Sequence, residues 1–345
     1  MFRYIGSKAA TAPALHRIIR QHASSGRFAD PFGGTGVVGA YFKSQGYAVT
    51  SGDLLRFPYY FQIARIALNR VPTFGRLRRA LGLQRVQDIK DILTTARSPD
   101  SWFVKEYSIA RCFFARENAC QIAGAWHKLQ RWDRKGLLSE AERAFLTASL
   151  INSMDAVANT AGTYYAFLKT WHRKALRPFR LQFLTPTPGT APCAALHGDA
   201  TEVFVGKSFD ILYLDPPYNA RDYGSYYHLP ESLSALKKPQ IRSGTFSGIP
   251  NNPTPRSALC RPRHAFENLA YLIMGIDWRT MVLHYSPHAL IDLKDIRDIM
   301  GSFGRVERHV VSTLGYTSSS SSRDTKHTVY VVRKPSSAAK PPVRH

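Results

Sequence analysis

The sequence predicts an α/β protein in which an open, largely parallel sheet is interrupted by one helical insertion. In residues 1–70 and 193–336, short apolar runs that end at a carboxylate alternate with helical patterns, as in sheets with helices on both faces. Residues 71–192 have long helical patterns instead, which indicates an inserted lobe. Residues 237–263 are basic and proline-rich, so we expect a loop there, and we expect residues 337–345 to form a disordered tail.

Composition favours a polyanionic partner. The 345 residues are 44% hydrophobic, and 47 Lys and Arg residues outnumber 24 Asp and Glu residues, for a formal net charge of +23. Such an excess favours nucleic acid; the alternative is a basic protein without such a partner. The first residues lack the apolar core of a signal peptide, and no run of about 18 apolar residues is present, so we expect a cytoplasmic protein with no membrane partner. The four cysteines are scattered, and we expect no metal site.

A glycine-rich turn is the first candidate ligand site. The run Asp30-Pro31-Phe32-Gly33-Gly34-Thr35-Gly36 lies between a short strand and a helix, so bare backbone and a helix N-terminus can face a ligand. The next strand ends at Asp53, where a carboxylate suits ribose hydroxyls. The alternative is an ordinary glycine turn. The elements expected here are a loop at residues 3–8, helices at 14–19 and 37–42, strands at 27–29 and 47–53, and a helix at 59–69.

The insertion combines aromatic and basic residues. Ser139 and Glu142 form a capping box, which predicts a helix running toward Met154. A polar loop at residues 159–165 comes next, and the basic residues after it are candidates for contacts to DNA phosphates. For any single aromatic residue, packing in the core is the competing interpretation.

The second half of the sheet ends at two further carboxylates. A short strand at residues 195–199 ends at Asp199, and an apolar run at 209–214 stops at Asp215-Pro216-Pro217-Tyr218. Prolines cannot continue a sheet ladder, so Asp215 should lie at the carboxyl end of a buried strand, where open α/β sheets bind ligands. A carboxylate, prolyl carbonyls and an aromatic ring can hold a planar group with an NH₂, such as adenine. The alternative is a Pro-Pro turn without function. A strand at 280–285, a helix at 291–300 and a strand pair at 305–312 and 328–333 complete the expected elements.

These motifs together resemble a known family. Arg3-Tyr4-Ile5-Gly6-Ser7-Lys8, the glycine-rich run, Asp53 and Asp215-Pro216-Pro217-Tyr218 occur in the order typical of N6-adenine DNA methyltransferases of the alpha (D12) class, especially the branch that contains the modification methyltransferase of the FokI system. The likeness extends from Phe2 to about Arg333. It departs from the family at Gly34, where another small residue is common, and in the long basic loop. The resemblance implies a Rossmann-like methyltransferase sheet that uses S-adenosylmethionine, with a mainly helical target-recognition lobe.

The resemblance also implies roles for individual residues. Asp215 and the Pro216 carbonyl would accept hydrogen bonds from the adenine amine, with Pro217 beside them, and Tyr218 would stack on the flipped base. The cofactor-binding residues implied or expected are Tyr4, Gly6, Lys8, Asp30, Phe32, Gly33, Gly34, Thr35, Gly36, Asp53, Leu54, Asp199 and Ala200. Those expected to contact DNA are Asn159, Thr160, Tyr164, Lys169, Arg173, Arg221, Tyr223 and Tyr226.

Three alternatives to this function stay open. N4-cytosine methylation uses the same geometry on another exocyclic amine, although an Asp in place of a Ser favours adenine. Adenine methylation in RNA is the second, because charge does not distinguish the two polymers. The third is a nucleic-acid-binding protein without catalysis. The expected partners are double-stranded DNA and a cognate restriction endonuclease, and the sequence does not define the oligomeric state.

Overall fold

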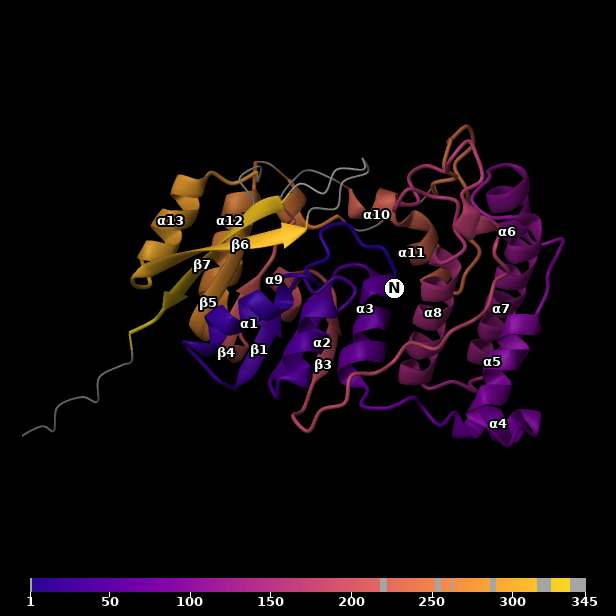
Figure 1. Ribbon diagram of the computed structural model, residues 1–345, viewed down its shortest axis with the longest axis horizontal. Coiled ribbons are helices and arrows are strands. Elements are labelled where there is room, and N and C mark those ends of the chain that lie inside the picture. The colour runs from indigo at the N-terminus through magenta and orange to yellow at the C-terminus, as the bar shows by residue number, and fades with distance from the viewer. Residues whose placement is uncertain are drawn as a thin grey trace, which may run out of the picture.

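A seven-stranded sheet forms one half of the molecule, and a helical lobe forms the other (Figure 1). The structure is a computed structural model, and it describes residues 2–217, 222–251, 256–261, 263–285, 290–314 and 324–335. Tyr218 and Arg221, the two predicted site residues in the first gap, lie outside the described residues, as does the predicted tail at 337–345.

The sheet has the strand order β3-β2-β1-β4-β5-β7-β6. The first five strands pair in parallel, and β7 is antiparallel to both of its neighbours. The sheet therefore has the predicted Rossmann-like arrangement, closed by the predicted strand pair. The strands are β1 (Arg27–Asp30), β2 (Ala48–Asp53), β3 (Ala194–His197), β4 (Ser208–Leu214), β5 (Asp277–Tyr285), β6 (Val306–Leu314) and β7 (Asp324–Arg333).

Helices cover both faces of the sheet because successive strand residues point to opposite sides. Phe28 and Ile211 pack against one set of helices, whereas Ala29 and Leu212 pack against the other. This explains why the sequence of β4 is apolar without alternation. One face is covered by α1 (Ala12–Arg20), α2 (Val37–Ser44) and the π-helical turn η1 (Ile63–Ala67), and the other by α9 (Ala200–Val203), α12 (Ala265–Gly275) and α13 (Leu293–Gly301).

The helical lobe packs around two long helices. The predicted capping box is present: the Ser139 hydroxyl accepts from the Glu142 N–H, and the Glu142 carboxylate accepts from the Ser139 N–H. The helix it starts, α8, ends at Asp155. The helices of this half are α3 (Arg56–Gln62), α4 (Gly75–Leu81), α5 (Val86–Thr95), α6 (Trp102–Val104), the π-helical turn η2 (Lys105–Ile109), α7 (Arg116–Arg134), α8 (Glu140–Asp155), α10 (Tyr223–Tyr226) and α11 (His228–Ser234).

The last third of the predicted helical insertion is not helical. From residue 156 to residue 193, a stretch that the structure describes throughout, the only helix is the short 3-10 turn η3 (Arg173–Leu176). Four prolines in residues 178–192 explain this, because each removes a backbone donor. Polar side chains of the long helices satisfy part of the extended backbone instead: Asn118 bonds the carbonyls of residues 175 and 177, and Ser149 accepts from the Leu184 N–H.

The core of the lobe is not confined to residues 71–192. Phe2, Phe57 and Phe61 from the first segment and Leu229 and Leu233 from α11 belong to the same buried cluster as the insertion. The core of the lobe thus depends on residues from both segments that flank the insertion. The boundaries of an insertion domain at residues 71–192 stay a prediction. Among the helices of the described ranges, none is long and apolar enough to cross a membrane.

Gly124 in α7 offers a test of this packing. A Cβ there would overlap the backbone of Ala96 and Arg97, and would lie 2.6 Å from the Ala96 carbonyl oxygen. Although Ala is the better helix former, we expect Gly124→Ala to lower the free energy of unfolding by about 1–3 kcal/mol. Gly75→Ala is the matched control, because no atom lies within 4 Å of its Cβ position. Urea titrations that rank the two variants in the opposite order would contradict the packing described.

Candidate active site

A cavity of about 280 Å³ lies at the carboxyl ends of β1, β2 and β4. The sheet register determines its position. Ala29 pairs with Leu212, so Asp30 and Asp215, which lie further along the two strands, reach the same edge of the sheet. Most of the predicted site residues line this cavity, namely Tyr4, Gly6, Lys8, Asp30, Phe32, Gly33, Gly34, Thr35, Asp53, Leu54, Asp199, Ala200, Asp215, Pro216, Pro217 and Tyr223.

The glycine-rich turn is held from behind by two side chains. Gln62 donates to the Gly34 and Gly52 carbonyls at 2.9 and 3.2 Å, and Arg65 donates to the Thr35 carbonyl at 2.6 Å. At Gly33, a Cβ would overlap the Ser51 hydroxyl, so a larger residue does not fit there. The carbonyls of the turn are thus bonded within the protein, and its open side faces the cavity.

The N-terminal segment closes the cavity opposite the turn. The Lys8 ammonium lies 2.8 Å from Asp215 Oδ2 and 3.2 Å from the Gly6 carbonyl oxygen. The Tyr4 ring stacks on Tyr227 with 5.0 Å between the ring centroids. The Tyr227 hydroxyl in turn accepts from the Ile5 N–H at 2.7 Å. The segment therefore brings a cation to the carboxylate that ends β4.

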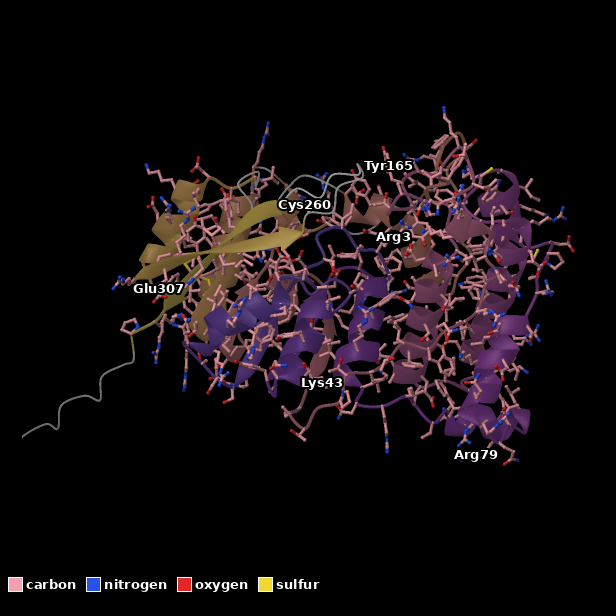
Figure 2. The ribbon with its side chains drawn as sticks, viewed as in Figure 1. Arg3, Lys43, Arg79, Tyr165, Cys260 and Glu307 are labelled. Atoms are coloured by element: carbon pink, nitrogen blue, oxygen red, sulfur yellow. The ribbon has the colours of Figure 1, made fainter. Side chains whose placement is uncertain are left out.

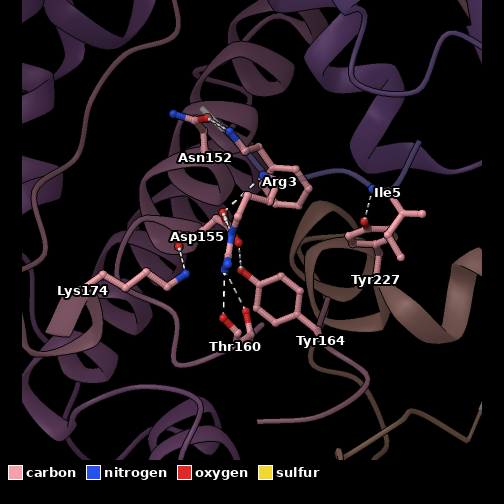
Figure 3. A network of polar contacts seen from close by, with 9 residues as sticks. Arg3, Ile5, Asn152, Asp155, Thr160, Tyr164, Lys174 and Tyr227 are labelled. Atoms are coloured by element: carbon pink, nitrogen blue, oxygen red, sulfur yellow. Dashed lines mark hydrogen bonds and ion pairs between the residues drawn. The ribbon is translucent and has the colours of Figure 1, made fainter. Parts of the chain in front are cut away.

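A polar network anchors this segment to the helical lobe (Figure 3). The Arg3 guanidinium pairs with Asp155, the last residue of α8, and donates to both oxygens of Thr160. The Tyr164 hydroxyl donates to the second oxygen of Asp155. Because a cation is favourable at a helix C-terminus, Arg3 also interacts well with the end of α8. One end of the cavity is thus attached to the lobe and the other to the sheet.

Several carboxyl groups lie together in the cavity, and burial raises the pKa of two of them. Burial, with repulsion from Asp215 and Asp53, raises the pKa of Asp30 to about 8. Burial also raises the pKa of Asp53 to about 7, although the Leu55 N–H donates to it at 2.9 Å. Neither oxygen of Asp30 has a hydrogen-bond partner of ordinary geometry among the described residues, and the nearby Phe32 N–H lowers its pKa only partly. A buried carboxyl group in this state fits a ligand that brings a positive charge and N–H donors.

Comparison with known proteins identifies the family. The family model of D12 class N6 adenine-specific DNA methyltransferases matches residues 4–248 of the 345-residue chain. This range contains the glycine-rich turn, Asp53 and the residues at the end of β4. The chain belongs to this family. The resemblance noted in the sequence is therefore confirmed.

Several curated relatives are restriction-modification enzymes by name. The chain is 31% identical to the Type II methyltransferase M.FokI of Planomicrobium okeanokoites, over 91% of this chain and 49% of that protein. It is 31% identical to Modification methylase StsI of Streptococcus sanguinis, over 87% and 46% of the two chains. It is 29% identical to the Type II methyltransferase M.NlaIII of Neisseria lactamica, over 88% and 89%. The chain thus spans about half the length of the first two relatives.

For a D12 family member, the cavity contains most of the expected cofactor residues and several that sequence reasoning missed. Gly36 is the exception: it has a φ of 75° at the start of α2 and does not line the cavity. Arg256, Ser257 and Cys260, on and beside η4 (Ala258–Cys260), line it from within the predicted basic loop. Gln62 and Arg65, which hold the turn, had no motif of their own. The sequence places both in the helix expected at residues 59–69, and that pattern predicts only that the helix packs on the sheet.

The residues expected to contact DNA divide into two groups. Asn159, Thr160 and Tyr164 are buried, so their side chains are not accessible to DNA in this structure. Asn159 donates to two carbonyls and accepts from the His172 N–H, which fixes the shape of the loop. The sequence of a polar loop does not reveal this, because internal bonding and DNA contact need the same side chains.

The other DNA candidates among the described residues are accessible. Lys169 and Arg173 are exposed, and Tyr223 and Tyr226 are partly exposed on α10 beside the cavity. The exposed Tyr165 ring lies against the Tyr226 ring, with 5.3 Å between the ring centroids, and this contact connects the loop to α10. Figure 2 shows Tyr165 at the face opposite Arg79. Of the accessible candidates, Tyr223 thus lines the cavity and Tyr226 lies on the same short helix.

The raised pKa of Asp30 predicts a pH-dependent stability. The folded state holds this proton up to about pH 8, whereas an unfolded Asp releases it near its ordinary value of 3.8, so ionisation opposes folding as the pH rises between these values. Asn cannot ionise. We expect Asp30→Asn to raise the Tm and the free energy of unfolding of the ligand-free protein. The gain in free energy of unfolding should grow from pH 5 to pH 8 by up to about 1.4 kcal/mol per pH unit.

The control for this prediction is Asp100→Asn, because Asp100 is exposed. Thermal denaturation of both variants and the parent across this pH range measures the effect. A gain for Asp30→Asn that stays constant with pH would show that Asp30 is ionised in the folded protein.

Proposed function

We propose that this protein transfers a methyl group from S-adenosylmethionine to the N6 amine of an adenine in double-stranded DNA. The observation that supports it best is the position of Asp215 and Pro216 at the end of β4, in the same cavity as the glycine-rich turn and Asp53. A cofactor site and an amine-binding site would thus be adjacent. The chain spans only about half of the first relatives, so their activities are reasons for the proposal and not properties of this chain.

The residues present fit S-adenosylmethionine. The buried carboxyl group of Asp30, whose oxygens lack ordinary partners among the described residues, suits an ammonium group, and Asp53 at the end of β2 suits ribose hydroxyls. Asp199 and Ala200 line the same cavity on the side of β3, where the cofactor adenine is expected. When bound, S-adenosylmethionine supplies an electrophilic methyl group next to a sulfonium. The carboxyl groups of the cavity favour this positive charge electrostatically.

Asp215 and Pro216 would orient the adenine amine. The lone pair of this amine is delocalised into the ring, so the nitrogen is a weak nucleophile. If the Asp215 carboxylate and the Pro216 carbonyl each accept one N–H, the nitrogen can pyramidalise and direct its lone pair at the methyl carbon. Asp30 and Asp53 would hold S-adenosylmethionine, which would supply the methyl group, and Asp215 would pass the proton that the amine loses on to solvent. Such positioning can supply roughly 7–11 kcal/mol of a barrier.

Lys8 would keep the carboxylate in place for this step. Its ammonium contacts Oδ2 of Asp215 at 2.8 Å, and the two side chains are 7% and 14% exposed. The ion pair would thus hold the Asp215 carboxylate in a fixed orientation toward the adenine amine. The role of Tyr218 in stacking on the base rests on its place in the sequence motif alone.

The loop after α8 and the segment beyond α11 would position the DNA. Arg111 donates to the Thr245 and Phe246 carbonyls, and the Phe246 ring stacks on Phe167 with 4.6 Å between centroids. These contacts join the two loops into one surface beside the cavity. With Lys169 and Arg173 exposed next to it, this surface suits contact with a phosphate backbone.

The names of the relatives support a role in restriction-modification. M.FokI and M.NlaIII are named Type II methyltransferases, and StsI is named a modification methylase. By this proposal the protein would modify host DNA in a prokaryotic cytoplasm, with a cognate endonuclease that cleaves the same unmethylated sequence.

Asp215→Ala tests the chemistry. We expect the parent to transfer label from S-adenosylmethionine to duplex DNA, and nucleoside analysis to identify N6-methyladenine. The variant should lose at least about 1,000-fold in rate, because both orientation and charge are lost at the reacting nitrogen. Its affinity for the cofactor, measured by calorimetry, should change little.

The same assay distinguishes the alternatives. Label in N4-methylcytosine or in RNA would assign the activity to another substrate on the same fold. Absence of cofactor binding by the parent would support a binding protein without catalysis. Full activity in Asp215→Ala would contradict the role given to this residue.

Arg173→Ala tests the DNA surface. Loss of one phosphate contact should weaken DNA binding and reduce the slope of log K against log salt concentration by about 0.9. Arg79→Ala is the matched control, since Arg79 is also exposed but lies far from Tyr165, which is in the same loop as Arg173 (Figure 2). Equal effects of the two substitutions in fluorescence-anisotropy titrations would argue that binding involves no defined surface.

A further inference from the structure

A group of three potential metal ligands lies at the far end of the sheet from the helical lobe. His22, Glu307 and His309 each offer one potential ligand atom, and these atoms all lie within 4.8 Å of one another. Figure 2 shows Glu307 well away from Cys260, which lines the cavity. The group therefore does not belong to the active site, and its role is independent of the proposed function.

The fold brings the three side chains together. Glu307 and His309 are two residues apart on β6, so they project from the same face of the strand. Val311, two residues further, is buried in the same core cluster as Leu15 and Ile19 of α1. His22 lies just beyond the end of α1, with its N–H bonded to the Ile19 carbonyl. The face of β6 that packs on α1 thus ends in two ligands, and the chain leaving α1 supplies the third.

The distances fit a metal better than hydrogen bonds. His22 Nε2 and His309 Nε2 lie 3.6 and 3.5 Å from the same oxygen, Oε2 of Glu307. Hydrogen bonds between nitrogen and oxygen are shorter, about 2.7–3.2 Å. Two ligands of a tetrahedral zinc ion, each about 2.0–2.2 Å from the metal, are separated by about 3.3–3.6 Å.

Both imidazole nitrogens also lack partners. His22 Nε2 and His309 Nε2 are buried from solvent and have no hydrogen bond in the described part of the chain. A buried nitrogen without a partner is unfavourable, and coordination of a cation would satisfy both at once. The Glu307 side chain is 46% exposed, which leaves a path for an ion to enter and room for water as a fourth ligand.

We propose that His22, Glu307 and His309 form a binding site for a divalent transition-metal ion, with Zn²⁺ as the expected occupant. Two imidazoles and one carboxylate are ligands that Zn²⁺ accepts readily. The bound ion joins the end of α1 to β6, which is the edge strand of the sheet. Its effect is to stabilise this end of the sheet and to fix α1, which comes soon after the Tyr4–Lys8 segment of the active site.

The test uses the full chain with any affinity tag removed and with metal removed by EDTA and dialysis. We expect one equivalent of Zn²⁺ to bind by calorimetry and to raise the Tm. Co²⁺ in its place should give the visible absorption of a tetrahedral complex. His22→Ala and His309→Ala should each weaken Zn²⁺ binding by on the order of 100-fold, since even outer-shell changes cost 10–100-fold.

Two further variants keep the test decisive. Glu307→Gln, at an exposed position that folding does not require, should also weaken Zn²⁺ binding at least about tenfold, even if a His variant fails to fold. His264→Ala is the matched control. His264 lies 4.0 Å from Glu267 on the surface, but among the described residues it has no third potential ligand nearby. It should bind Zn²⁺ as the parent does.

Three results would overturn the proposal. One is a parent protein that binds no Zn²⁺ at micromolar concentration. Another is unchanged affinity in both His22→Ala and Glu307→Gln. The last is a Tm of the parent protein that changes neither on addition of Zn²⁺ nor on its removal by EDTA.

Discussion

The position of Asp215 beside the glycine-rich turn depends on the pairing of β1 with β4. The chain forms β1, β2 and β3 in one direction and then returns to place β4 on the other side of β1. At this reversal, the loops that leave β1 and β4 diverge to opposite faces and open a crevice. Both strands are buried on both faces, so a shift in register would expose apolar side chains and is strongly disfavoured. The active-site geometry thus inherits the rigidity of the central sheet.

The cavity also needs groups that the sheet does not supply. Lys8 and Tyr4 arrive on the N-terminal segment, whose position is determined by Arg3 at the end of α8 and by Tyr227 next to α11. The cofactor side and the helical lobe are therefore coupled through a short piece of chain. In the proposed function, a change in the lobe on DNA binding would have a direct physical route to Lys8 and hence to Asp215.

The electrostatics of the cavity favour ligand binding over stability of the empty protein. Asp215 pairs with Lys8 in the cavity, and burial raises the pKa of two further carboxyl groups there, Asp30 and Asp53. Replacing Asp30 with a neutral residue would remove a buried ionisable group that opposes folding at neutral pH. Its presence is reasonable if a cationic ligand relieves this penalty, because such a ligand then binds with coupled release of a proton.

The sequence alone determined the fold class and most of the predicted site residues that line the cavity. Strand ends marked by Asp30, Asp53, Asp199 and Asp215 could be predicted because prolines and glycines next to apolar runs restrict the backbone locally. The capping box at Ser139 is a local signal of the same kind. The family resemblance rests on these short motifs, and it was confirmed.

Only the tertiary structure decided what depends on contacts between distant segments. The burial of Asn159 and Tyr164 and the support of the glycine turn by Gln62 and Arg65 have no local signature, because each depends on tertiary contacts. The cluster of His22, Glu307 and His309 is the extreme case. Its members come from opposite ends of the chain, and no spacing between them could indicate a metal site. Local patterns report backbone preferences, whereas the packing of the whole chain determines which side chains meet.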